Sequence, residues 1–247
     1  MATYLLLCSC EEPIDVKLNN KGGNLVIEGV VGDILPAYVI VSRSTDFKDT
    51  TLLKTVVADA VTVTDNLGKT DTFQRDNATG FYFALGLGQP QVGNSYTLKV
   101  TTEGKTYESV CAVNAPVPID SVYTSKSSFS DEDRLMIDFR DPAGSPNYYK
   151  AMVFVNKQWR TGNHLSDDKL TDGKIKSLRM NVGDFQTGDT IDVFLQSLDK
   201  SAYDYFSSIE SNSGQNAAPT NPISNITGGS MGYFSAYRSS TKQLIFP

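Results

Sequence analysis

The sequence predicts a mainly β protein of two modules, and three features of the 247-residue chain support that prediction. From residue 24 to about residue 113, apolar and β-branched side chains recur at every second position, and turn-forming residues interrupt them roughly every 8 to 12 positions. Two prolines at 115–118 then mark a boundary, because proline cannot donate a hydrogen bond inside a sheet. The alternation returns after residue 119 and gives way to helical spacing near residue 200.

The N-terminal module, residues 24–114, is expected to be an immunoglobulin-like β-sandwich. Two hairpin turns support it, at Asp65-Asn66-Leu67-Gly68 and at Glu103-Gly104, where glycine accepts the positive φ angle that a tight hairpin requires. Short strands at this density are typical of such sandwiches. The predicted strands lie near 24–31, 37–43, 60–65, 70–75, 80–86, 95–102 and 105–113.

A second β-rich module is expected over residues 119–247. The proline-containing connector at 115–118 favours an extended, semi-rigid chain between the two modules. The predicted strands of the second module lie near 119–125, 133–140, 148–157, 174–181, 189–198, 231–238 and 241–246.

One helix is predicted in this second module, at about 200–211. Asp199 can cap its N-terminus, and apolar residues follow at helical spacing. These residues are Ala202, Phe206 and Ile209. The segment 212–225 is rich in Ser, Asn, Gly and Pro and is expected to form a long exposed loop.

The start of the chain has the form of a bacterial lipoprotein signal over residues 1–9. Its apolar run stops at Leu7-Cys8-Ser9-Cys10, where a signal peptidase would cut before Cys10. The Cys10 thiol would then carry a lipid, and three acyl chains would hold the protein durably on a membrane, with residues 10–23 as a linker. An ordinary apolar start, or a truncated signal, is the alternative, because the usual positive segment is missing.

Composition excludes several classes of function. The chain has 28 acidic and 22 basic residues, a net charge of -6, and no basic cluster interleaved with aromatic residues, so nucleic-acid binding is disfavoured. Cys111 is expected to be a packed strand thiol, because the other cysteines, Cys8 and Cys10, belong to the leader. One histidine and one thiol cannot make the usual zinc site, and no cofactor is predicted.

Gly228-Gly-Ser-Met-Gly232 fits the Gly-x-Ser-x-Gly pattern of a hydrolase nucleophile elbow. That elbow needs a following helix and a later histidine, whereas the sole histidine, His164, comes earlier and residues 233–237 alternate like a strand. We interpret Ser230 as part of a glycine-rich turn and His164 as a solvated residue, and we predict no enzymatic activity. A hydrolase remains the alternative if acid, base and nucleophile converge in a cleft.

Asp167, Asp168 and Asp172 form an acidic segment that could offer oxygens to calcium. The spacing is not that of an EF-hand, so a solvated hairpin loop is the favoured interpretation and no metal is predicted. A melting temperature that added calcium leaves unchanged would exclude the calcium hypothesis.

Trp159, Tyr148 and Tyr149 are the candidates for contact with a ligand or partner, because flat rings with a polar edge stack well against sugars and peptides. Trp159 is favoured, since it adjoins polar Gln158 and Arg160 near a loop. Most of the other aromatic residues are expected in the core. These rings suggest a glycan-binding or adhesion module on the cell surface as an alternative function.

Several segments, in their order and spacing, resemble the Bacteroidota outer-membrane lipoproteins catalogued as domain of unknown function 4249. The segments are Cys10-Glu-Glu-Pro-Ile-Asp-Val, Leu25-Val-Ile-Glu-Gly, Val41-Ser-Arg-Ser44, Ala60-Val-Thr-Val-Thr-Asp65, Pro116-Val-Pro-Ile-Asp-Ser-Val122, Asp141-Pro-Ala-Gly with Asn147-Tyr-Tyr149, and Asn225-Ile-Thr-Gly-Gly229 with Gly232-Tyr-Phe. The resemblance implies a lipid-anchored accessory of a TonB-dependent transporter in nutrient capture, and it supplies no catalytic residues. The acidic residues that follow Cys10 resemble an export tag for the outer face of the outer membrane.

Overall fold

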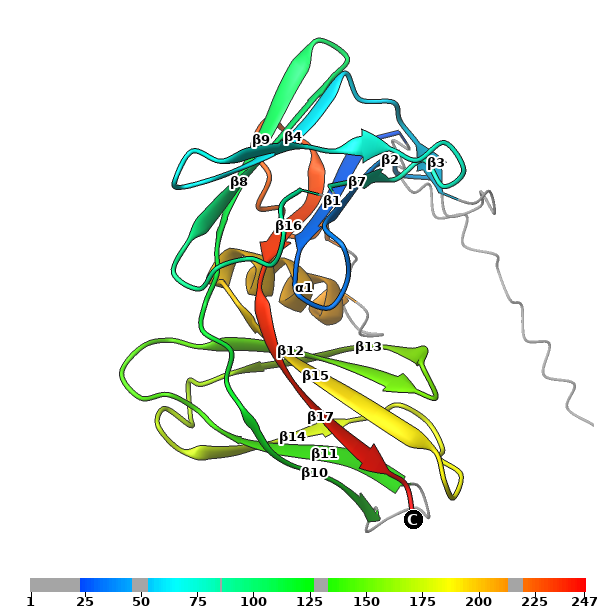
Figure 1. Ribbon diagram of the computed structural model, residues 1–247, viewed down its shortest axis with the longest axis vertical. Coiled ribbons are helices and arrows are strands. Elements are labelled where there is room, and N and C mark those ends of the chain that lie inside the picture. Colours follow the sequence, from blue (N-terminus) through cyan, green and yellow to red (C-terminus); the bar gives the residue numbers. More distant parts are fainter. Residues whose placement is uncertain (1–22, 46–52, 85, 127–132, 213–219) are drawn as a thin grey trace, which may run out of the picture.

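A computed structural model of the chain describes residues 23–45, 53–84, 86–126, 133–212 and 220–247 (Figure 1). The predicted leader, the lipidation residue Cys10 and nearly all of the predicted linker lie outside these residues. The described part has four sheets and one helix, so the predicted mainly β class is confirmed.

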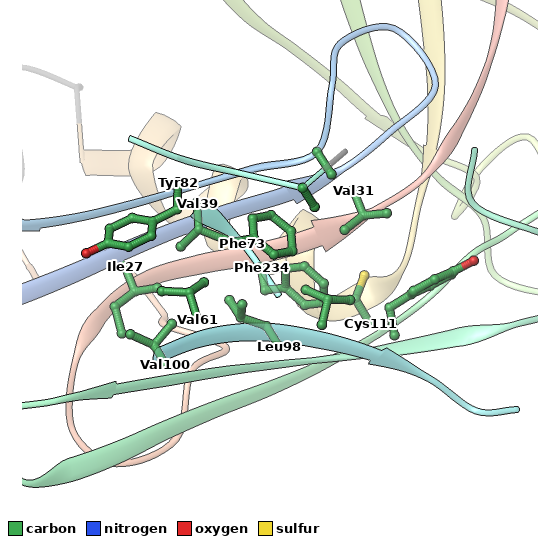
Figure 2. Packing of buried hydrophobic residues seen from close by; sticks show 14 of the residues in the cluster. Ile27, Val31, Val39, Val61, Phe73, Tyr82, Leu98, Val100, Cys111 and Phe234 are labelled. Carbon is green, nitrogen blue, oxygen red and sulfur yellow. The ribbon is translucent and has the colours of Figure 1, made fainter. Parts of the chain in front are cut away.

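Two sheets form the upper half of the molecule in Figure 1 and pack around one core. Sheet A contains β1 (Leu25–Val31), β2 (Tyr38–Arg43), β3 (Lys54–Thr55), β6 (Gln74–Arg75), β7 (Tyr82–Phe83) and β16 (Met231–Ala236). Sheet B contains β4 (Ala60–Asp65), β5 (Thr70–Thr72), β8 (Ser95–Thr102) and β9 (Lys105–Ala112). Figure 2 shows Ile27, Leu98 and Phe234 meeting in the core between these sheets, and all three are essentially inaccessible to solvent.

The strand expected at 231–238 within the second module instead completes the first. β16 pairs in parallel with β1, and Met231 to Ala236 lie opposite Val26 to Val31. Parallel strands need a long connection between them, and here the chain between β1 and β16 includes every strand of the second module except the last, Arg238–Ile245. The chain therefore passes between the two halves before residue 119, again before β16 and again directly after β16.

Two further sheets form the lower half of the molecule and share a second core. Sheet C contains β10 (Ile119–Lys126), β11 (Asp133–Arg140) and β14 (Ile175–Met180). Sheet D contains β12 (Tyr148–Val155), β13 (Gln158–Asp167), β15 (Thr190–Leu198) and β17 (Arg238–Ile245). The sequence did not predict β13, which is an edge strand of sheet D, so the interpretation of its residues as a polar loop is corrected.

The predicted helix is confirmed as α1 (Lys200–Asn212). Asp199 caps it, because its Oδ1 accepts a hydrogen bond from the Ala202 backbone N–H at 2.9 Å. Ala202, Tyr205 and Phe206 are its buried residues. α1 lies between the two halves (Figure 1), so its apolar face has sheet surface available above and below.

A third apolar cluster joins the two halves beside α1. It combines Val30 of β1 with Leu198 of β15, Tyr205 and Phe206 of α1, and Tyr237 between β16 and β17. All five are less than one tenth exposed. Burial of this size stabilises a fixed arrangement of the halves, because each buried large apolar side chain contributes about 1.5–3 kcal/mol.

Candidate functional site

Sheet D is covered on both faces. Tyr149 and Ala151 of β12 point into the core shared with sheet C and are fully buried. Successive side chains of a strand point to opposite faces, so Lys150, Met152 and Phe154 point the other way, toward α1 and sheet A. The second face of β12 therefore needs a partner surface, and residues of sheet A provide it.

The facing surfaces leave a cavity of about 250 Å³, called the interface cavity below. Half of its lining residues are aromatic: Tyr38, Phe154, Trp159, Phe206, Tyr233 and Tyr237. Ser235 on its wall is 1% exposed, whereas Leu35 and Trp159 are 45% and 57% exposed, so the cavity opens on their side. Pockets that are apolar, aromatic and supplied with a few polar groups are the usual form of small-molecule sites.

Lys150 brings a positive charge into this cavity. No carboxylate pairs with it among the described residues, and its Nζ lies 3.6 Å from the centroid of the Phe206 ring. Burial lowers the pKa of Lys150 to about 8, because desolvation disfavours the charged form. The amine is still mostly protonated at pH 7, as a cation without a counter-ion in apolar surroundings.

Two neutral polar side chains complete the cavity lining. Ser235 Oγ is buried and has no hydrogen-bond partner within the described part of the chain. Gln196 is also buried, and its Nε2 contacts Met152 Sδ, a weak acceptor, at 2.8 Å. A buried polar group left without a partner costs about 1–3 kcal/mol, so each such group calls for an explanation.

Tyrosine hydroxyls border the cavity on the side of sheet A. Those of Tyr38 and Tyr233 hydrogen-bond to each other. Burial raises the pKa of both tyrosines, and the nearby Glu28 carboxylate raises it further. Burial likewise raises the pKa of Tyr237. These phenols stay neutral at physiological pH and act as hydrogen-bonding groups.

The three aromatic candidates from the sequence lie in three different environments. Trp159 lines the interface cavity and is more than half exposed. Tyr148 stacks on Tyr203 of α1, with ring centroids 4.9 Å apart. Tyr149 is fully buried, and its hydroxyl donates a hydrogen bond to Asp141 Oδ1. Of the three, Trp159 is the one whose position suits contact with a ligand.

Carboxylates gather between two turns, in a set that differs from the predicted one. Asp168 and Asp172 lie with Asp141, and their oxygens are within 4.8 Å of one another, whereas Asp167 pairs with Lys169 at 3.0 Å. Three such oxygens could serve a hard cation such as Ca²⁺. Each carboxylate also accepts a backbone N–H of the chain: Asp141 from Gly173 at 3.2 Å, Asp168 from Asn147 at 2.8 Å and Asp172 from Gly144 at 2.8 Å. These hydrogen bonds give the cluster a structural role in joining the turns.

Replacing Asp141 with asparagine is expected to lower the free energy of unfolding by about 1–2 kcal/mol. Asp141 is 1% exposed and accepts hydrogen bonds from the Tyr149 hydroxyl and from Gly173 N, and an asparagine NH₂ would face one of these donors. Chemical denaturation of D141N, Y149F and the double variant tests whether the two side chains interact. The double variant should lose less free energy of unfolding than the two single variants lose together. Strictly additive costs would show that the two side chains do not interact.

The apparent nucleophile motif begins in a glycine-rich turn, as interpreted from the sequence, and ends inside β16. Gly228, Gly229 and Gly232 have positive φ angles of 92°, 90° and 110°. Ser230 Oγ is buried and has no hydrogen-bond partner among the residues that the structure describes. No histidine or carboxylate of that part of the chain is therefore placed to activate it.

The structure corrects the prediction for His164 and confirms the prediction for Cys111. His164 was expected to be solvated, but it lies in β13 with a buried Nε2, and burial followed by the Lys150 charge lowers its pKa. Cys111 is fully buried in β9, as predicted, and its Sγ accepts the Ala236 N–H at 3.0 Å. Burial raises the pKa of Cys111, so the reactive thiolate is disfavoured.

Sequence reasoning missed the polar residues of the interface cavity, Lys150, Gln196 and Ser235. The sequence of β12 does contain a signal for Lys150. Met152 and Phe154 are apolar, although simple alternation assigns their face of the strand to solvent. Apolar residues on both faces indicate a strand covered on both sides. Lys150 is the charged exception on that face.

No helix within the described residues is long and apolar enough to cross a membrane. A comparison with curated proteins gives no match. A comparison with protein families matches residues 11–243, which is most of the chain. The chain therefore belongs to the family described as Domain of unknown function (DUF4249), as its motifs predict.

Proposed function

We propose that this chain is a non-enzymatic lipoprotein that captures a small molecule as an accessory to a TonB-dependent transporter. It is anchored through Cys10 in the outer membrane of a Bacteroidota cell and faces the exterior. The lipoprotein signal at residues 1–10 and the family resemblance support the location and the partner. The single observation that carries the capture role is the aromatic interface cavity.

Its geometry supports binding rather than catalysis. The interface cavity is enclosed by residues of both halves and of α1, which is a common place for ligand sites. Its titratable tyrosines hold their protons at neutral pH, and Ser230 has no activating partner in the described part of the chain. A hydrolytic set of nucleophile, base and oxyanion donors would need contacts that these residues do not make.

The immunoglobulin-like assignment of the first module belongs to the same proposal. Sheets A and B share one core, and the strands of sheet B are paired in antiparallel fashion, which supports that class of sandwich. The parallel pairing of β1 with β16 is a departure from an all-antiparallel pattern.

Affinity pull-down from outer membranes tests the partner. The full chain should recover a TonB-dependent barrel, and a Cys10→Ala variant should lose both the membrane fraction and the barrel. Mass spectrometry of the native product should find lipid on the Cys10 sulfur. Repeated pull-downs without such a barrel would reject the accessory role.

A glycan-binding or adhesion module is the second candidate, and the exposure of Trp159 favours it. The ring is 57% exposed beside the cavity, so it could stack against a sugar from outside. A glycan array separates the two functions, because an adhesin should retain an oligosaccharide and lose it in Trp159→Ala.

A further inference from the structure

The interface cavity contains a charge that the described protein does not neutralise. Among its lining residues Lys150 is the charged one, and the titratable group whose pKa its charge lowers is His164, which is not an acid. The Glu28 carboxylate raises the pKa of Tyr38, Tyr205 and Tyr233, whereas burial is the cause of the lowered pKa of Lys150. A buried cation of this kind is stabilised when an anion enters, because charge-assisted hydrogen bonds are stronger than neutral ones.

Ser235 gives a second and independent indication of a missing group. It is 1% exposed, lines the same cavity and has an unpartnered hydroxyl within the described structure. A serine hydroxyl can donate to a carboxylate oxygen, as can a lysine ammonium. Among the described residues, an ammonium without a carboxylate partner and an unpartnered hydroxyl in one small cavity match the acceptor atoms of a single anionic group.

The remaining lining residues indicate the chemical character of the uncharged part of the ligand. Aromatic rings surround the cavity, and the hydroxyls of Tyr38 and Tyr233 already bond to each other. A neutral sugar would bring many hydroxyl groups to few free partners, which is costly. An aromatic body suits ring contacts instead.

The size of the cavity sets the size of the ligand. A cavity of about 150 Å³ accepts benzene, so about 250 Å³ accommodates roughly ten non-hydrogen atoms. Three larger hollows among the described residues, of about 440, 480 and 370 Å³, are lined by charged, aliphatic and turn residues and have no aromatic wall.

We infer that the interface cavity binds a small aromatic carboxylate, whose anionic group accepts hydrogen bonds from Lys150 and Ser235 and whose ring packs against Phe154, Trp159 and Phe206. This inference rests on the capture role proposed above and names the chemical class of the captured molecule. The charge of the ligand replaces the missing counter-ion of Lys150, and Trp159 borders the entrance.

Titration calorimetry with trans-cinnamate and its neutral isostere cinnamamide tests the inference on the full chain. The carboxylate should bind, and the amide should bind at least about tenfold more weakly, because a hydrogen bond to a charged group is worth roughly tenfold to hundredfold in affinity. Trp159 is the one tryptophan of the chain, so its indole N–H signal in an NMR spectrum should shift on binding. Equal affinities for the two compounds, or no binding of cinnamate, would overturn the inference.

Variants then locate the charge recognition. Lys150→Met should reduce cinnamate affinity by about tenfold or more and remove the preference over cinnamamide, and Ser235→Ala should reduce it by about two- to tenfold. Lys105→Met is the matched control, because Lys105 is exposed in the β8–β9 hairpin and does not line the cavity. Unchanged binding in Lys150→Met, or an equal loss in the control, would contradict the assignment.

The two proposals can fail separately. Cinnamate binding that depends on Lys150, together with a pull-down that recovers no barrel, would keep the anion site and reject the transporter role. Recovery of the barrel by a chain that binds neither probe would reject the anion site and keep the accessory role.

Discussion

Replacing Gly232 with alanine is expected to lower the free energy of unfolding by more than about 4 kcal/mol, or to prevent folding altogether. A Cβ atom at this position would lie 1.9 Å from Ile27 O and 2.7 Å from the Ile27 carbonyl carbon. These are backbone atoms of β1, so no side-chain rotation can relieve the contact. The φ angle of +110° adds strain for any residue with a Cβ.

Gly229→Ala is the matched control, because Gly229 has a φ angle of +90° but open space around its Cβ position. It should cost about 1–2 kcal/mol, which is the cost of the backbone conformation alone. Urea unfolding of both variants separates clash from strain. Equal costs would show that β16 does not approach β1 as closely as described.

The expected loss in Gly232→Ala exceeds that of an ordinary strand substitution because β16 holds two parts of the protein together. Phe234 is buried in the core of the first half, while Tyr233 and Ser235 line the interface cavity. Displacing β16 from β1 therefore disturbs the core and the candidate site at once. Near-UV circular dichroism should report both changes, since Tyr233 lies 4.8 Å from the rings of Tyr205 and Phe206.

The sequence was sufficient to predict most elements, because the signals for them are local. Alternation predicted long strands such as β8 and β9, and their Glu103-Gly104 turn has the positive φ angles of 53° and 72° that a tight hairpin requires. The capping residue Asp199 and the spacing of apolar residues predicted α1. In each case the residues that specify the element lie within it or next to it.

β13 could not be predicted in this way because it is an edge strand. Its residues 158–162 are mostly exposed on both faces, so they carry no apolar alternation to read. Within its sheet the strand pairs with β12 alone, for example through Phe154 opposite Trp159. An edge strand of this kind is indistinguishable from a polar loop by composition.

The pairing of β16 with β1 could not be predicted from the sequence either. Period-two alternation shows that one face of residues 231–236 is buried, but it does not identify the strand that pairs with them. The interface cavity shares this difficulty, because its wall combines residues from Val30 to Tyr237 along most of the chain. When long-range pairing assembles a site, the sequence indicates it through single unusual residues. Lys150, a charged residue in an apolar strand, is an example.

Lys150→Met is the second large effect, and it is expected to stabilise the unliganded protein at pH 7 by about 1–3 kcal/mol. The wild-type pKa falls from 10.5 to about 8, so the folded protein carries a penalty of up to about 3 kcal/mol for keeping this buried group charged. Methionine removes the penalty and fills similar volume, at the loss of about 1 kcal/mol from the contact with Phe206. A variant that is more stable yet binds the anion poorly would mark Lys150 as a functional residue.

The pH dependence gives the sign of this effect. Since the pKa of Lys150 is lowered in the folded state, the unfolded state binds more protons between about pH 8 and 10.5. The free energy of unfolding of the wild-type protein therefore increases as pH rises through that window. The gain is absent in Lys150→Met, so the advantage of the variant should be largest below pH 8 and should shrink toward pH 10.5. The tyrosines with raised pKa values act in the opposite direction at high pH, but they are common to both proteins and cancel in the difference.

His164 offers a direct check on the cause. It is the sole histidine of the chain, and its pKa is lowered by burial and by the positive charge of Lys150. Removing that charge should raise the His164 pKa toward its ordinary value of 6.5 without restoring it fully, because burial remains. NMR titration of the imidazole signals measures the shift in both proteins. An unchanged His164 pKa, together with a constant stability difference from pH 7 to pH 10, would mean that the Lys150 ammonium is solvated, and the uncompensated charge on which the anion site depends would then be absent.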